Sequence, residues 1–126
     1  MGAPIRILLV EDNDVYRASL ELLFEMQEGL DVVGGVSDGA AAAAACAELR
    51  ADVVLMDLRL PGLDGPAATQ AVRAACPTAA VLCLTAEATD EEAAAMTAAG
   101  AVGIARKGGP VDVLVGAVRR AAVGDA

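Results

Sequence analysis

Short, uninterrupted apolar runs recur along this chain, and three of them end in a polar side chain. Residues 7–10, 53–56 and 81–84 lead into Glu11-Asp12, Asp57 and Thr85. Runs of this length are typical of strands that are buried on both faces, as in a parallel sheet. In an open α/β sheet the ligand site lies outside the carboxyl ends of the strands. The sequence therefore predicts a site where these polar residues meet.

Strand-like and helix-like segments alternate along the whole chain. The predicted strands are residues 6–10, 30–36, 53–57, 80–85 and 102–106, and the predicted helices are about 14–27, 39–50, 66–75, 90–99 and 110–123. This fivefold (βα) alternation predicts an α/β fold with one doubly wound parallel sheet and helices on both faces. The run 53–57 is the most apolar and should be central, whereas 30–36 should form an edge.

Helix boundaries are indicated by capping residues. Asn13 or Asp14 is suited to cap the first helix. The segment from Thr89 to Glu92 has the capping-box pattern and should open the fourth helix. In the first helix the apolar spacing predicts that four side chains face inward, namely Val15, Leu22, Leu23 and Met26.

The composition excludes several classes of function. The chain has 126 residues, which is one domain's worth, and a formal net charge of −9 at pH 7. Such a charge argues against nucleic-acid binding by this chain alone, because that needs a basic face. No apolar run approaches the roughly 20 residues that span a bilayer, and no signal-peptide pattern precedes the first strand. We therefore expect a cytoplasmic protein without a membrane partner.

Cysteine and histidine usage narrows the chemistry further. Cys46, Cys76 and Cys83 lack the spacing of a metal site and are predicted to be buried, reduced thiols. The chain has no histidine. This excludes a histidine-based catalytic triad, a histidine zinc site and a phosphohistidine on this chain.

Glu11, Asp12 and Asp57 would bring three carboxylates together at neighbouring strand ends. These charges repel one another, and a hard divalent cation with oxygen ligands relieves the repulsion. Mg²⁺ fits, because it is usually held by one or two carboxylates and a phosphate. Lys107 follows the last predicted strand and adds a positive charge, while Thr85 offers a hydroxyl group. The set suits phosphoryl chemistry, in which a carboxylate forms an acyl phosphate.

Each of these residues also has a simpler interpretation. Capping the first helix could be the whole role of Glu11 and Asp12, because acidic groups near a helix N-terminus interact favourably with the helix dipole. Thr85 could be an ordinary strand residue, and Lys107 could be a solvated loop lysine. Ile104, in the fifth predicted strand, is expected to be core.

The order and spacing of these residues resemble the receiver domain of two-component response regulators (CheY-like), over essentially the whole chain. The most specific segment is 57–65, Asp-Leu-Arg-Leu-Pro-Gly-Leu-Asp-Gly, and 8–12, 84–86 and 100–107 also match. The pattern is similar to the NarL/LuxR-type subfamily, whose receivers usually precede a helix-turn-helix DNA-binding domain. The resemblance implies a flavodoxin/CheY-like fold with strand order 2-1-3-4-5. It also implies that residues 1–126 form a single receiver domain with no output domain in this chain.

The resemblance implies a phosphoacceptor with a bound metal ion. Asp57 would accept a phosphoryl group from the phosphohistidine of a sensor histidine kinase. Asp12 and Asp57 would bind Mg²⁺ directly, together with the backbone carbonyl of Arg59. Glu11 would act through a metal-bound water. The domain would thus catalyse its own phosphorylation and dephosphorylation without being a classified enzyme.

The resemblance also implies how phosphorylation is sensed. Thr85 would hydrogen-bond the phosphoryl oxygen and Lys107 would pair with it, while Arg59 and Glu87 would flank the acyl phosphate. The face formed by 90–99, 102–106 and the last helix would then bind an output domain or a second copy of the chain. One departure is that Ile104 stands where the family has a switch aromatic. Another is that Gly108, instead of proline, follows Lys107.

Three other functions compete with this interpretation. A degenerate or stand-alone receiver would act by protein–protein binding without phosphorylation-driven switching, and Ile104 gives that hypothesis some weight. A phosphohydrolase would need a second carboxylate two residues after the nucleophile, where this chain has Arg59. A flavodoxin-like cofactor binder is weaker, since the chain lacks a phosphate-cradling glycine loop and has only 2% aromatic residues.

Overall fold

The computed structural model describes residues 2–124, so residues 1 and 125–126 of the predicted domain lie outside it. Strands and helices alternate as predicted, with one short 3₁₀ helix (η1) added before the second helix. In chain order the elements are β1 (Ile5–Val10), α1 (Asp14–Glu25), β2 (Leu30–Val36), η1 (Gly39–Ala41), α2 (Ala42–Leu49), β3 (Val53–Asp57), α3 (Gly65–Ala75), β4 (Ala80–Thr85), α4 (Asp90–Ala99), β5 (Ala101–Arg106) and α5 (Val111–Ala122).

The strands form one parallel sheet in the order β2-β1-β3-β4-β5, which confirms the predicted topology. β3 is central and every one of its residues is buried, whereas β2 lies at an edge and is partly exposed. In the register, Val10 pairs with Met56, and Asp57 pairs with Leu84. Because all strands run in the same direction, the residues that follow β1, β3 and β4 meet at one edge of the sheet.

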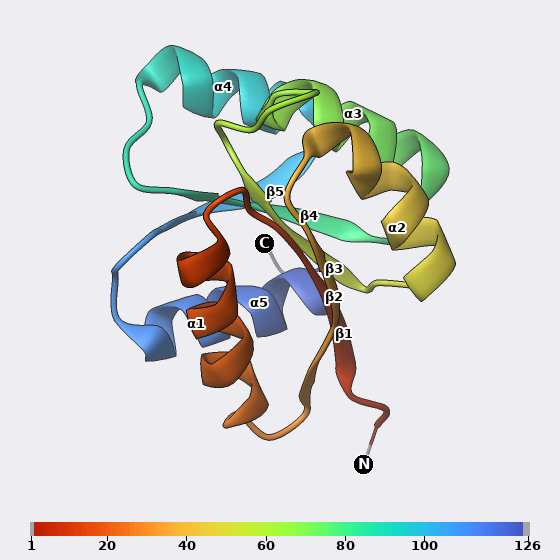
Figure 1. The fold of residues 1–126 in the computed structure, drawn as a ribbon, viewed down its shortest axis with the longest axis vertical. Coiled ribbons are helices and arrows are strands. Elements are labelled where there is room, and N and C mark those ends of the chain that lie inside the picture. The colour runs from red at the N-terminus through yellow and green to blue at the C-terminus, as the bar shows by residue number, and fades with distance from the viewer. Residues whose placement is uncertain (1, 125–126) are drawn as a thin grey trace.

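Helices cover both faces of the sheet, with α2, α3 and α4 on one side and α1 and α5 on the other (Figure 1). Successive side chains of a strand point to opposite faces. In β3 this places Val54 and Met56 in the core under α2–α4, and Val53 and Leu55 in the core over α1 and α5. Burial on both faces explains why the strands have continuous apolar sequences.

The loop after β3 is held close to the end of that strand. The backbone N–H of Gly65 donates to the carbonyl of Leu58 at 2.9 Å. A Cβ atom on Gly65 would lie 2.8 Å from the backbone oxygen of Asp57, so a larger residue would push the loop away. Asp64 caps α3 by accepting a hydrogen bond from the backbone N–H of Ala67 at 3.1 Å. These contacts fix the path of the backbone that follows Asp57.

The predicted inner face of the first helix is wrong. Val15, Leu22 and Met26 are 81%, 65% and 80% exposed, and Leu23 is only half-buried. The side chains that face the sheet are instead Leu20 and Phe24, four residues apart. The helix carries two apolar stripes, and packing against β1 and α5 selects the one that includes Phe24, the chain's single phenylalanine.

Two further side chains differ from expectation. Ile104 is 42% exposed and lies outside the core: it is on the edge strand β5 and lines surface clefts. Cys46 and Cys83 are buried free thiols as predicted, but Cys76 is half-buried, because it caps the end of α3 at the surface. Within residues 2–124, no helix is both long and apolar enough to cross a membrane.

Candidate functional site

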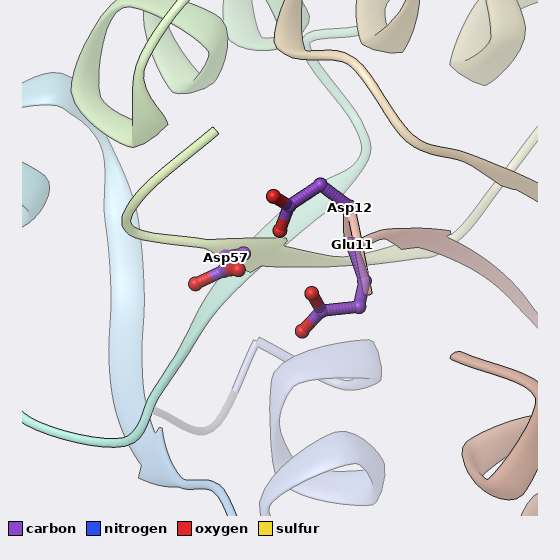
Figure 2. A group of neighbouring side chains, drawn as sticks. All are labelled: Glu11, Asp12 and Asp57. Carbon is purple, nitrogen blue, oxygen red and sulfur yellow. The ribbon is translucent and has the colours of Figure 1, made fainter. Parts of the chain in front are cut away.

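Three carboxylates meet at the edge of the sheet where the apolar runs end. Glu11 and Asp12 follow β1, and Asp57 is the last residue of β3. One oxygen from each lies within 4.8 Å of the others, and Figure 2 shows the three side chains converging from the two strand ends. Glu11 and Asp57 are only 2% and 6% exposed, whereas Asp12 is open to solvent. The predicted acidic cluster is therefore present.

Lys107 provides the positive charge of this cluster. Its Nζ donates a hydrogen bond to Asp57 Oδ2 at 3.0 Å and forms an ion pair with Glu11. Burial lowers the pKa of Lys107, but the contacts with Glu11 and Asp57 outweigh it, and the net pKa is raised. The ammonium group also lies 5.2 Å from the ring centroid of Tyr16, a cation–π distance. Lys107 is thus charged at neutral pH and held against Asp57.

Tyr16 is a site residue that the sequence interpretation missed. It lies in the first turn of α1, where the N-cap Asn13 accepts a hydrogen bond from its backbone N–H at 2.9 Å. Burial raises the pKa of its hydroxyl, although a backbone hydrogen bond at Gly108 and the charge of Lys107 oppose the shift. A signal was available in the sequence, since Tyr16 is the chain's single tyrosine and follows the acidic pair closely.

Thr85 ends β4 next to the cluster and is buried. Its hydroxyl donates to the carbonyl of Glu87 at 2.9 Å and accepts from the backbone N–H of Glu87 at 3.2 Å. Its own carbonyl accepts from the backbone N–H of Lys107 at 2.9 Å. The hydroxyl is therefore engaged with its own loop, in a cleft of about 500 Å³ that Thr85 lines with the three carboxylates, Lys107, Arg59 and other residues.

Arg59 and Glu87 line the same cleft as Asp57. The backbone N–H of Arg59 donates to Asp57 Oδ1 at 3.4 Å. The Arg59 side chain forms a two-point ion pair with Glu92 at the start of α4. Glu92 is a second residue that the sequence interpretation missed, since it was assigned only to the capping box. Ile104 lines a separate cleft of about 430 Å³ with Thr85 and Glu87.

The donor atoms fit a small, hard cation. Glu11 Oε1 is buried and forms an ion pair with the Lys107 ammonium group. The other oxygen, Oε2, accepts from the backbone N–H of Asn13 at 2.9 Å. Three carboxylates face one lysine, so the cluster keeps an excess of negative charge. An oxygen-only, anionic donor set of this kind suits Mg²⁺.

A scan against protein families matches residues 7–119 to the response regulator receiver domain. This chain belongs to the response regulator receiver family. The receiver domain is 31% identical to the transcriptional regulatory protein LiaR of Bacillus subtilis over 121 residues, which is 96% of this chain and 57% of LiaR. It therefore spans little more than half the length of this curated relative.

Solved structures agree with this assignment. The receiver domain matches the signal receiver domain of the putative response regulator NarL from Mycobacterium tuberculosis with a TM-score of 0.92 and 28% identity, covering 98% of this chain and 99% of the other. It matches the receiver domain of the sensor histidine kinase PA1611 from Pseudomonas aeruginosa with a TM-score of 0.84 and 32% identity, covering 96% and 99%. That second structure has a magnesium ion coordinated in its active-site cleft. Receiver domains thus bind Mg²⁺ at an acidic site.

Proposed function

We propose that Asp57 is the phosphoacceptor of this receiver domain and takes a phosphoryl group from the phosphohistidine of a sensor histidine kinase. The observation that carries this is the position of Asp57, whose carboxylate lies beside an acidic pair and contacts the chain's single lysine. In the transfer the N–P bond of the donor breaks and a bond forms between phosphorus and an Asp57 oxygen. These 126 residues contain no histidine, so the donor phosphohistidine lies outside them.

The residues around Asp57 have separate tasks in this proposal. Lys107 donates to Oδ2 and neutralises negative charge as the phosphoryl group arrives. Thr85 gives up its hydrogen bond to the Glu87 carbonyl and donates to a phosphoryl oxygen. That exchange would pull the loop between β4 and α4 towards Asp57. It is the step by which phosphorylation changes the shape of the domain.

Four groups would hold Mg²⁺. Asp12, Asp57 and the backbone carbonyl of Arg59 would be direct ligands, and Glu11 would bind through a water molecule. The convergence of the three carboxylates and the excess negative charge of the cluster support this set. When bound, the ion would neutralise the oxygens of the phosphoryl group during transfer.

Mg²⁺ is expected to raise the free energy of unfolding. A ligand that binds only the folded chain contributes about 2.7 kcal/mol at a hundredfold excess over its dissociation constant. Urea unfolding with increasing MgCl₂ should show this gain, and Asp12→Asn should need more Mg²⁺ to reach it. NaCl at matched ionic strength is the control. If the midpoint of urea unfolding does not change when Mg²⁺ is added, the metal site is ruled out.

The switched domain would act on a partner through the face formed by α4, β5 and α5. Exposed Val102, Ile104 and Val113 lie on these elements, which supports an interface there. We propose that the partner is a DNA-binding output domain or a second copy of this chain. The similarity to a transcriptional regulatory protein supports such an output and a cytoplasmic location. Because the net charge of this chain is negative, any contact with the DNA backbone would be made by the output domain.

Incubation with acetyl phosphate tests the proposed function without the unidentified kinase. With Mg²⁺ present, intact-mass spectrometry should show one phosphoryl group per chain, and EDTA should remove the effect. A beryllofluoride complex should shift the amide signals of residues 85–92 and of β5 in NMR spectra. An adduct without those shifts would support the receiver that does not switch. No adduct at all would overturn the proposal.

A further inference from the structure

The loop after β3 is tied to the start of α4 by one ion pair. Arg59 Nη2 donates to Glu92 Oε1 at 3.2 Å, and Nη1 donates to Oε2. These residues are 33 positions apart in sequence, and their side chains are 63% and 29% exposed. A two-point contact between a guanidinium and a carboxylate fixes orientation as well as distance. The Arg59 guanidinium is thereby held in a defined orientation at the start of α4.

Glu92 serves a second purpose in the same position. Its Oε1 accepts from the backbone N–H of Thr89 at 3.0 Å, and its own N–H donates to the Thr89 hydroxyl at 3.1 Å. This is the capping box that opens α4. The capping contact therefore fixes the orientation of the same carboxylate that Arg59 contacts. Bonding to Arg59, followed by Thr89, lowers the pKa of Glu92 to about 2.

Arg59 lies between two clefts. One is the 500 Å³ cleft that it shares with Asp57, Thr85 and Lys107. The other, of about 750 Å³, it shares with Glu92 and Glu91 on α4. A phosphoryl group on Asp57 would add close to two negative charges to the first cleft. That group and Glu92 would then compete for the same guanidinium.

We propose that Glu92 is a positioning residue that holds the Arg59 guanidinium at the start of α4 and releases it to a phosphoryl group arriving on Asp57. The inference rests on the proposed phosphorylation of Asp57 and adds a residue on α4 to it. Release would break the tie between α4 and the loop after β3. This gives the chain a route from Asp57 to α4 that needs no aromatic side chain at Ile104.

Glu92→Gln is the informative variant, because glutamine keeps the capping box but loses the charge that holds Arg59. At limiting acetyl phosphate with Mg²⁺, its phosphorylation rate should rise roughly two- to fivefold, the scale of an exposed ion pair. Glu91→Gln is the matched control, since it removes a neighbouring charge from the same helix turn and the same cleft. Its rate should equal that of the parent. In an Arg59→Ala background, Glu92→Gln should have no effect.

A second measurement does not depend on phosphoryl transfer. The side-chain Nε–H signal of Arg59, followed by ¹⁵N NMR, should differ between the parent and Glu92→Gln, because the variant loses the charged partner of the guanidinium. Beryllofluoride with Mg²⁺, which mimics the phosphoryl group, should shift that signal in the parent as well. If neither change moves the Arg59 signal, the inference is overturned. Equal rates for Glu92→Gln and Glu91→Gln would also overturn it, whereas a parent that takes no phosphoryl group would overturn the proposed function instead.

Discussion

Asp57→Asn is expected to abolish the phosphoryl adduct completely while the domain stays folded. The amide of asparagine is not a nucleophile towards phosphorus, but it has nearly the shape of the aspartate that ends β3. Lys107 keeps an ionic partner, because it also pairs with the buried carboxylate of Glu11. Intact-mass spectrometry after incubation with acetyl phosphate and Mg²⁺ measures the loss, and circular dichroism reports the fold.

The control for this variant is Asp31→Asn. Asp31 is an exposed residue of β2, paired with Arg6 near the start of β1 and thus far from the carboxyl edge of the sheet. It should take the phosphoryl group as the parent does. An adduct that persists in Asp57→Asn would show that the acceptor is another residue.

Lys107→Met should lower the free energy of unfolding by about 3 kcal/mol when divalent cations are absent. Methionine keeps much of the side-chain volume but removes the only ammonium group beside Glu11 and Asp57. Removing one partner of a buried ion pair is costly, because the remaining charges are neither solvated nor compensated. Urea unfolding in EDTA measures the loss. Saturating Mg²⁺ should recover part of it, because a cation then faces the same carboxylates.

Arg106→Met provides the comparison for Lys107→Met. Arg106 is the adjacent residue and is exposed, so its loss should change the free energy of unfolding by less than about 0.5 kcal/mol. Equal unfolding curves for the two variants would contradict the role of Lys107 in the cluster. An unchanged response to Mg²⁺ in Lys107→Met would contradict the proposal that ion and lysine compensate the same charges.

The sheet could be predicted from the sequence because its strands are buried on both faces. Residues 30–36, 53–57 and 80–85 were predicted with the observed bounds, and the first and last strands differ by one residue. With the strand order that the family resemblance implies, parallel strands end at one edge of the sheet. Glu11, Asp12 and Asp57 must therefore lie close together. The candidate site was therefore largely predictable.

Helix orientation was less predictable, because the local pattern is ambiguous. The first helix has apolar side chains on two faces, and only its contacts with the sheet decide that Phe24 is inside and Leu22 outside. The ion pair between Arg59 and Glu92 could not be predicted from local sequence patterns, because the two residues are 33 positions apart. Glu87, Glu91 and Glu92 are all close in sequence to Thr85, and only the geometry of the α4 N-terminus selects one of them.

The exposed apolar stripe along α1 and its C-cap makes the domain prone to self-association at high concentration. Val15, Leu22 and Met26 are solvated on a chain whose net charge is −9 at pH 7. Electrostatic repulsion between like-charged molecules opposes their association through these exposed apolar side chains. That repulsion fades as the pH approaches the isoelectric point near 4.2 or as salt shortens its range. Concentrated samples should therefore stay clear longest in dilute buffer at neutral pH, and self-association should begin on acidification.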